Sequence, residues 1–334
     1  MTGIAEKRSS LLLEKQPVSK KDTMAFQPAQ TTSNILMVRP AHFSFNEETA
    51  GSNAFQSNDA TQPATEISQK AVAEFDAFVE RLRLAGVNVI VVQDTDKPVK
   101  PDAVFPNNWV TFHEDGKIVT YPMYATVRRL ERREDILKNI QSEYRVEKKI
   151  HLEEYENIGQ YLEGTGSMIF DRTNKIAYAC LSPRTNLVLL KRFCKLTGYE
   201  PVAFHAVDGE GKEIYHTNVM MALGETFVVI CLETVEDDEE AAELLQKFAE
   251  THKEIIEITM EQMMAFAGNM LQVRNAAGDT YLVMSEQAYR SLTETQVQQI
   301  QKHTNILFSP IPTIETFGGG SVRCMMAEVF LPKK

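Results

Sequence analysis

Short apolar runs alternate with longer segments of helical periodicity along most of the chain. The first run, Ile35–Val38, predicts a strand. Apolar side chains then recur every three or four residues from Val72 to Leu82, which predicts a helix that ends at Gly86. The run Val87–Val92, rich in β-branched residues, follows directly and predicts a second strand.

The same alternation returns several times further along the chain. Helical segments are predicted at 125–144, 185–197, 237–252 and 285–302, and further strands at 175–179, 227–230 and 305–308, with a final strand at 325–330. About five units of a helix plus strands therefore recur at intervals of roughly 40–60 residues, a cadence typical of repeat architectures. An ordinary doubly wound α/β sheet is the alternative. Neither a Gly-x-Gly-x-x-Gly motif between a strand and a helix nor a P-loop occurs, so nothing indicates a nucleotide cofactor.

The N-terminal segment lacks this pattern. It is polar, rich in Lys, Gln, Ser and Thr, and without clear periodicity, so we expect residues 1–33 to form a disordered arm. Residues 34–334 are expected to form one catalytic domain.

Composition and charge narrow the classes of function. The chain has 334 residues, of which 43% are hydrophobic and 24% charged, enough to bury a large core. Its net charge of -11 argues against a nucleic-acid-binding or anionic-membrane-binding surface, and no apolar stretch is long enough to span a bilayer. The cysteines are spread singly, at Cys180, Cys194, Cys231 and Cys324. Reduced thiols in a cytoplasmic protein, with no metal site, are the simplest interpretation.

Three separate segments carry candidate chemistry. Cys324 follows the glycine triplet 318–320, His216 lies between two strand-like runs, and Glu163 precedes Gly-Thr-Gly. Each residue alone is more typical of a structural position than of a catalytic one. Together they supply a thiol, an imidazole and a carboxylate, and a cysteine nucleophile requires a base and a group that orients the base.

A fourth segment, Pro101–Trp109, holds Asp102, the adjacent amides of Asn107 and Asn108, and the only tryptophan of the chain. Taken alone, it is typical of a polar turn that caps a strand.

The order of these segments resembles the guanidino-group-modifying superfamily, which includes arginine deiminases, amidinotransferases, dimethylarginine hydrolases and succinylarginine dihydrolases. The residues of these motifs are most similar to those of the citrulline-utilisation hydrolases. The matching segments appear in family order and are Met37–Pro40, Phe105–Trp109, Tyr121–Met123 with Arg128-Arg129, Glu163–Gly166, Leu181–Thr185, His216–Asn218 and the glycine-rich segment that ends at Cys324.

The resemblance implies a pentein fold, an α/β propeller of five pseudo-symmetric units around a central site, and covalent thiol catalysis without a metal or an organic cofactor. It implies that Cys324 is the nucleophile, that His216 is the general acid/base, and that Glu163 orients the histidine. Arg128 and Arg184 match positions that bind the substrate α-carboxylate, a task that suits the planar guanidinium fork.

The chain departs from the deiminase pattern at two positions. Asn108 and Asn218 stand where arginine deiminases carry aspartates. A neutral amide offers both a donor and an acceptor, which suits an uncharged ureido group better than a guanidinium ion. With Asp102 as a further substrate contact, the hypothesis is hydrolysis of citrulline to ornithine, CO2 and ammonia.

Other interpretations remain open from the sequence. Succinylarginine dihydrolases also have asparagine near the first position, so an arginine or N-substituted-arginine dihydrolase or deiminase is an alternative, as is an amidinotransferase. A non-catalytic pentein binding factor would be a different class, which the joint presence of Cys324, His216 and Glu163 argues against. The expected partner is a small amino-acid substrate; the oligomeric state stays open, a homo-oligomer included.

Overall fold

The computed structural model describes residues 28–58 and 62–334. Within these residues, fifteen strands form five three-stranded sheets. The strands are β1 (Asn34–Arg39), β2 (Asn88–Gln93), β3 (Val110–Phe112), β4 (Lys117–Thr120), β5 (Lys148–His151), β6 (Ile169–Asp171), β7 (Ile176–Cys180), β8 (Glu200–Phe204), β9 (Met221–Leu223), β10 (Phe227–Ile230), β11 (Glu254–Glu257), β12 (Leu271–Arg274), β13 (Thr280–Ser285), β14 (Asn305–Ser309) and β15 (Ala327–Glu328).

Helices connect and cover these sheets. The α-helices are α1 (Glu47–Ala50), α2 (Ala64–Leu84), α3 (Glu134–Glu143), α4 (Gly164–Ser167), α5 (Leu187–Thr197), α6 (Thr217–Met220), α7 (Asp238–Glu250), α8 (Met260–Met264), α9 (Glu286–Ser291), α10 (Glu294–Gln301) and α11 (Pro312–Gly318). The 3-10 helices are η1 (Pro106–Asn108), η2 (Val127–Glu131), η3 (Glu153–Ile158) and η4 (Leu232–Thr234).

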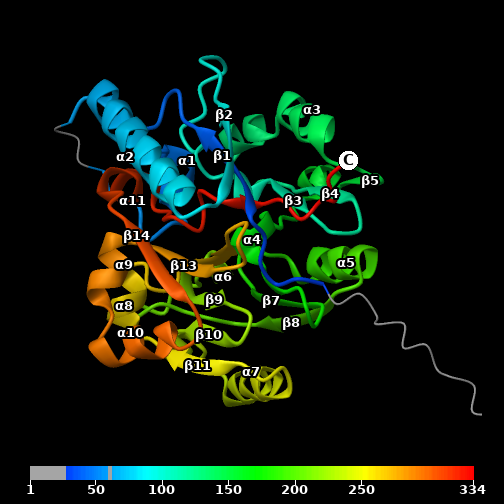
Figure 1. Ribbon diagram of the computed structural model, residues 1–334, viewed down its shortest axis with the longest axis vertical. Coiled ribbons are helices and arrows are strands. Elements are labelled where there is room, and N and C mark those ends of the chain that lie inside the picture. Colours follow the sequence, from blue (N-terminus) through cyan, green and yellow to red (C-terminus); the bar gives the residue numbers. More distant parts are fainter. Residues whose placement is uncertain (1–27, 59–61) are drawn as a thin grey trace, which may run out of the picture.

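Each sheet repeats one plan. Its first strand pairs antiparallel with the second, and the second pairs parallel with the third, as in β6-β7-β8. A parallel pair requires a crossover, and a helix supplies it between the second and third strands: α2, α3, α5, α7 and the pair α9–α10. These helices lie toward the outside of the molecule, and α4 and α6 lie near its centre (Figure 1).

Chain closure completes the ring of sheets. The last strand, β15, pairs antiparallel with β1, with Ile35 opposite Glu328 and Leu36 opposite Ala327. First strands of neighbouring sheets contact one another, as β15 contacts β3 and β9 contacts both β6 and β12. The red C-terminal segment therefore runs through the middle of the molecule beside the blue β1 (Figure 1). The expected five-unit α/β propeller is confirmed, and the doubly wound alternative is wrong.

The apolar faces predicted for the helices pack inward. In α2, Phe75, Phe78 and Leu82 are fully buried, whereas Leu84 at the end of the helix is exposed. Full burial of side chains of this size contributes about 1.5–3 kcal/mol each. Cys180 and Cys231 lie in β7 and directly after β10, and both are buried thiols without a disulfide.

Two predicted helices are each divided in the structure. The segment 125–144 forms η2 and α3, because Arg133 is extended between them and uses its guanidinium to bind Asp94 and Asp135. The segment 285–302 forms α9 and α10, because Thr293 accepts a hydrogen bond from the Gln296 backbone and the Gln296 side chain accepts one from the Thr293 backbone, a capping box that starts a new helix.

The final strand is shorter than the sequence pattern predicts. Residues 325–330 are apolar enough for a strand, but only Ala327–Glu328 is one. Met325 N donates to Val322 O and Met326 N donates to Arg323 O, so the residues after the glycines form a tight turn instead. This turn carries Cys324.

The ordered chain also begins earlier than the predicted boundary at residue 33. Gln30 is buried; its amide donates to Phe170 O and accepts from Arg172 N. Thr32 donates to Val329 O. Residues 28–33 are therefore packed, and the rest of the predicted arm, residues 1–27, lies outside the described residues.

A cluster of buried charged side chains holds β15 in place through Glu328. Glu328 accepts from Arg323 at 2.7 Å and lies 3.5 Å from Arg172, whose guanidinium stacks over the Phe330 ring. Burial disfavours the carboxylate, but the two guanidinium groups outweigh it and hold the pKa of Glu328 below its usual value.

We expect Glu328→Gln to lower the free energy of unfolding by about 3 kcal/mol, because it leaves two buried cations without their carboxylate. Urea denaturation measures the change. The matched control is Glu286→Gln, which removes an exposed i,i+4 pair with Arg290 and should cost less than about 0.5 kcal/mol. Equal losses in the two variants would contradict the assignment of Glu328 as a fastening residue.

Candidate active site

Five short turns deliver side chains to the centre of the ring. Each directly precedes the first strand of a sheet: η1 before β3, α4 before β6, α6 before β9, the turn 265–268 before β12, and the turn 322–325 before β15. At or beside these turns stand Asn108, Glu163, His216 with Asn218, Asn269, and Cys324. Residues far apart in sequence therefore occupy equivalent places in the five units.

The predicted site residues converge on one narrow cavity. Its walls include six of them: Asp102, Asn108, Arg128, Arg184, His216 and Cys324. The other two lie directly behind this wall, because Glu163 is hydrogen-bonded to His216 and Asn218 to Cys324. The rest of the lining consists of Thr49, Asn53, Phe105, Tyr215 and the glycine triplet.

Glu163 holds His216 in one orientation. Its Oε2 lies 2.8 Å from His216 Nε2, and its Oε1 accepts a hydrogen bond from Tyr124 N at 2.8 Å. An ionised carboxylate only accepts, so Nε2 carries the proton and Nδ1 is the free basic nitrogen. The helix α4 fixes the carboxylate, since Glu163 N donates to Ser167 Oγ one turn later.

The buried charges assign the protonation states. Burial opposes ionisation of Glu163, but the Arg184 charge and the His216 hydrogen bond outweigh it and lower the pKa of Glu163 to about 2. Burial also disfavours imidazolium, and despite the help of Glu163 the pKa of His216 falls to about 4. Near pH 7 the pair is therefore a carboxylate beside a neutral imidazole.

Two amides converge on the Cys324 sulfur. Asn218 Nδ2 and Asn269 Nδ2 each lie 3.4 Å from Sγ, as donors directed at the thiol. The orientation of Asn269 is fixed by the backbone, because its Oδ1 accepts from Arg323 N and its Nδ2 also donates to Asn218 O. N–H donors around sulfur stabilise negative charge that develops there.

Sequence reasoning missed Asn269. The signal that could have found it is the repeat itself. Asn108-Trp109-Val110, Asn218-Val219-Met220 and Asn269-Met270-Leu271 each set an asparagine before two apolar residues, two or three positions before the first strand of a sheet begins. Without the strand register, Gly268-Asn269 reads as an ordinary loop.

The glycines around the site provide space. A Cβ on Gly166 would lie 2.7 Å from His216 Nδ1 and would also meet Asn108 Nδ2, so only glycine leaves these two nitrogens free beside each other. Gly319 adopts a left-handed conformation (φ 59°) that ends α11, and its carbonyl accepts from Tyr215 OH.

Arg128 reaches the cavity but is already engaged. Its Nε and Nη2 donate to the two oxygens of Glu131 at 2.8 and 2.9 Å, and Nη1 donates to Asn108 Oδ1 at 3.0 Å. Asp102 Oδ2 lies 3.7 Å from Nε. Burial opposes the charge of Arg128, but Glu131 and Asp102 raise its pKa. The predicted role of Arg128 as a binder of the substrate carboxylate stays untested. Its contacts favour a role in positioning Asn108 instead.

Arg184 borders both the inner cavity and an outer hollow. Its Nη1 lies 3.6 Å from Glu163 Oε2, Nη2 donates to Thr49 O at 3.3 Å, and its guanidinium lies 4.9 Å from the Tyr215 ring centroid. The outer hollow is lined by Glu48, Gly51, Ser52, Tyr124, Pro183, Arg184, Lys212, Glu213 and Tyr215.

Four polar atoms of the site have no hydrogen-bond partner among residues 28–58 and 62–334. They are Asp102 Oδ1, Asn108 Nδ2, Arg184 Nε and Asn218 Oδ1. A buried polar atom without a partner is costly, so a ligand that matches two acceptors and two donors fits this cavity.

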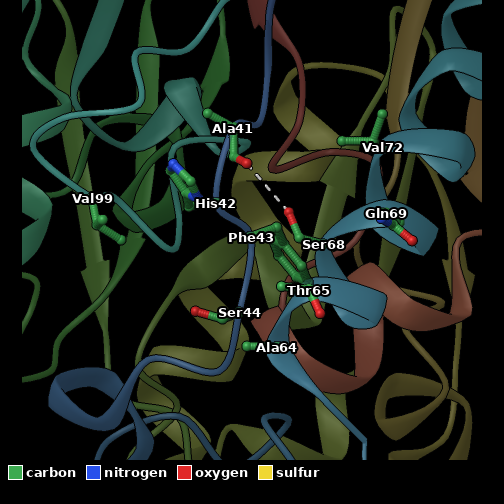
Figure 2. A pocket seen from close by; sticks show the side chains of 10 residues that line it. All are labelled: Ala41, His42, Phe43, Ser44, Ala64, Thr65, Ser68, Gln69, Val72 and Val99. Carbon is green, nitrogen blue, oxygen red and sulfur yellow. Dashed lines mark hydrogen bonds between the residues drawn. The ribbon is translucent and has the colours of Figure 1, made fainter.

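A larger pocket lies elsewhere. Figure 2 shows it between the start of α2 and residues 41–44, where Ser68 Oγ donates to Ala41 O. It contains none of the eight predicted site residues, and its only titratable side chain is His42. Size alone therefore does not identify the site.

The described residues contain neither a metal-binding cluster nor a membrane-spanning helix. No group of three His, Cys, Asp or Glu side chains is arranged there to hold a metal ion. Nor does that part of the chain contain a helix of the length and apolarity needed to cross a membrane.

Comparison with known families gives one match. Residues 39–331 match the family described as N,N-dimethylarginine dimethylhydrolase, eukaryotic. A comparison with curated protein sequences finds no match.

Solved structures share the fold at low sequence identity. The product-bound N-terminal domain of ArgZ, described as an arginine dihydrolase from the ornithine-ammonia cycle in Cyanobacteria, is 17% identical with a TM-score of 0.71, over 90% of this chain and 98% of that chain. Unliganded AgrE is 16% identical with a TM-score of 0.70, over 90% and 40%. A dimethylarginine dimethylaminohydrolase variant, as its adduct with S-methyl-L-thiocitrulline, is 15% identical with a TM-score of 0.61, over 89% and 99%.

We expect the His216 imidazole to titrate near pH 4, well below the ordinary value of about 6.5, because the ring is buried and Arg184 and Arg128 repel the added proton. NMR of ¹⁵N-labelled histidine measures this, with His216→Asn to assign the signal. Since the unfolded chain takes up that proton at higher pH, stability should fall as the pH drops from about 6.5 to 4. A midpoint above 6.5 would contradict the neutral resting state.

Proposed function

Because the chain belongs to the N,N-dimethylarginine dimethylhydrolase family, we propose that it is a cysteine-dependent hydrolase of an amino acid that carries a ureido or guanidino group, and that citrulline is its preferred substrate. The products would be ornithine, CO2 and ammonia. Cys324 is the proposed nucleophile, His216 the general acid/base and Glu163 the residue that orients the histidine.

One observation carries the preference for a ureido group. Asn108 turns its Oδ1 to Arg128, so the atom left for the cavity is Nδ2, a donor. A guanidinium ion carries only N–H donors and would leave Nδ2 unmatched, whereas the carbonyl oxygen of a ureido group accepts from it. A site built around a hydrogen bond strongly disfavours an analogue that lacks the partner.

Two of the other three free atoms complement the N–H groups of a ureido group. Asp102 Oδ1 in the cavity wall and Asn218 Oδ1 behind it are both acceptors. Three buried carboxylates, Asp102, Glu131 and Glu163, stand against the guanidinium groups of Arg128 and Arg184. A neutral group adds no further charge to this set.

The proposed reaction begins with attack of Cys324 Sγ on the ureido carbon, as His216 Nδ1 takes the thiol proton. The imidazolium that forms is stabilised by Glu163, and Asn108 Nδ2 donates to the oxygen as it gains negative charge. His216 then gives its proton to the leaving nitrogen, and ammonia departs. An S-linked carbamoyl derivative of the substrate remains on the enzyme.

Water completes the turnover. His216 removes a proton from water as the water attacks the thiocarbamate carbon, and the Cys324 thiol is released. The resulting carbamate of ornithine loses CO2. Departure of ornithine first, followed by hydrolysis of a carbamoyl-enzyme, gives the same products.

A guanidino substrate is the second candidate. Two carboxylates, Asp102 and Glu163, stand at or behind the cavity wall, and carboxylates suit a guanidinium ion. The description of the matched family names dimethylarginine as the substrate. One of the similar solved structures is described as an arginine dihydrolase. An arginine or dimethylarginine hydrolase would use the same thiol chemistry.

Product analysis distinguishes these candidates. Purified protein is given citrulline, arginine or N,N-dimethylarginine, and ornithine, citrulline and ammonia are quantified. We expect ornithine and one ammonia from citrulline, with at least a ~10³-fold loss of rate in Cys324→Ala. Citrulline as the product from arginine or dimethylarginine would contradict the preferred substrate; ornithine with two ammonia from arginine would establish a dihydrolase. Turnover that survives in Cys324→Ala would contradict the mechanism.

A further inference from the structure

We infer that Arg128 and Glu131 form a clamp that fixes the direction of the Asn108 amide, and that this direction, rather than the mere neutrality of the asparagine, selects the substrate group. The inference deepens the proposed function and rests on it. Arg128 is thus a positioning residue that acts through Asn108.

The clamp is rigid and buried. Glu131 binds Arg128 through both carboxylate oxygens, and both side chains are almost completely inaccessible to solvent. Both residues belong to η2, so the pair is set by local backbone. Arg128 Nη2 also donates to Phe105 O at 3.4 Å, beside the turn that carries Asn108.

The chemistry of Arg128 allows one amide direction only. A guanidinium has five N–H donors and no acceptor, so the Asn108 atom that it contacts must be the oxygen. Reversal of the amide would set two donors against each other in a buried site, which costs a hydrogen bond and leaves Oδ1 unpaired. Nδ2 is therefore held at the cavity, next to Gly166 and His216 Nδ1.

An aspartate at position 108 would present an acceptor to the cavity in place of the Nδ2 donor, without disturbing the clamp. One carboxylate oxygen would accept from Arg128 as Oδ1 does now, and the other would present an acceptor and a negative charge to the cavity. The same clamp would then favour a guanidinium ion. Because Arg128 fixes one atom of residue 108, the identity of the other atom decides whether the cavity favours a ureido or a guanidino substrate.

The test measures discrimination, defined as kcat/KM for citrulline divided by kcat/KM for arginine. Three variants isolate the clamp. Arg128→Lys keeps a cation that only donates, Arg128→Met with Glu131→Leu removes both buried charges together, and Asn108→Asp changes the polarity directly. Circular dichroism and thermal unfolding establish that each variant is folded.

We expect the wild-type protein to prefer citrulline by about 10²-fold or more, as the loss of a buried hydrogen-bond partner implies. Arg128→Lys should retain most of this preference. Arg128→Met with Glu131→Leu should reduce it by at least ~10-fold, because the amide is then free to turn, and Asn108→Asp should invert it.

Contrary outcomes separate the two proposals. If wild-type protein turns over neither substrate, the proposed function fails, and the inference fails with it. If wild-type protein prefers citrulline but the folded double variant keeps the same ratio, the clamp is overturned and the function stands. If the double variant does not fold, Asn108→Asp decides, since an unchanged preference for citrulline in that variant overturns the inference.

Discussion

The closed ring of five sheets determines where the candidate site residues lie. Five inner strands must meet around one axis, so the turn that precedes each strand necessarily delivers its side chains to the same small volume. Residues as distant in sequence as Asn108 and Cys324 become neighbours without any dedicated local motif. The fold supplies five directions of approach to a substrate, and chemistry requires only that each turn carry a suitable side chain.

Charge balance is the second constraint. Glu163 keeps its charge although it is buried, because the Arg184 charge and the His216 hydrogen bond stabilise the carboxylate. His216 stays neutral chiefly because burial disfavours the imidazolium, and the charges of Arg184 and Arg128 add to this effect. The two arginines therefore influence the protonation state of both Glu163 and His216.

Much of this arrangement could be predicted from the sequence, and the parts that could not be predicted have physical reasons. Hydrophobic periodicity predicted α2, α5 and α7, because long amphipathic segments bury one face. It also predicted both strands that flank α2 and the strands β7 and β10 that precede α5 and α7, but not β8 and β11, which follow them. It did not predict the break at Thr293, which a capping box decides, or the shortness of β15, which the Cys324 turn decides. The eight candidate residues named from their motifs lie at or directly behind one cavity, but Asn269 was not named, because its signal exists only in the register of the strands. The contacts of Arg128 depend on Glu131, a partner that no pattern singled out.

The closure of the ring also sets an order in time. Among the described strands β1 is made first, yet β15, its partner in the same sheet, is made last. Until then β1 lacks its β15 partner, a state in which strands are prone to pair with other chains. A growing polypeptide presents Glu163 and His216 long before Cys324 leaves the ribosome. Cys324 thus joins His216 in one cavity only when the ring can close, so the pairing of thiol and imidazole does not exist in a half-made chain.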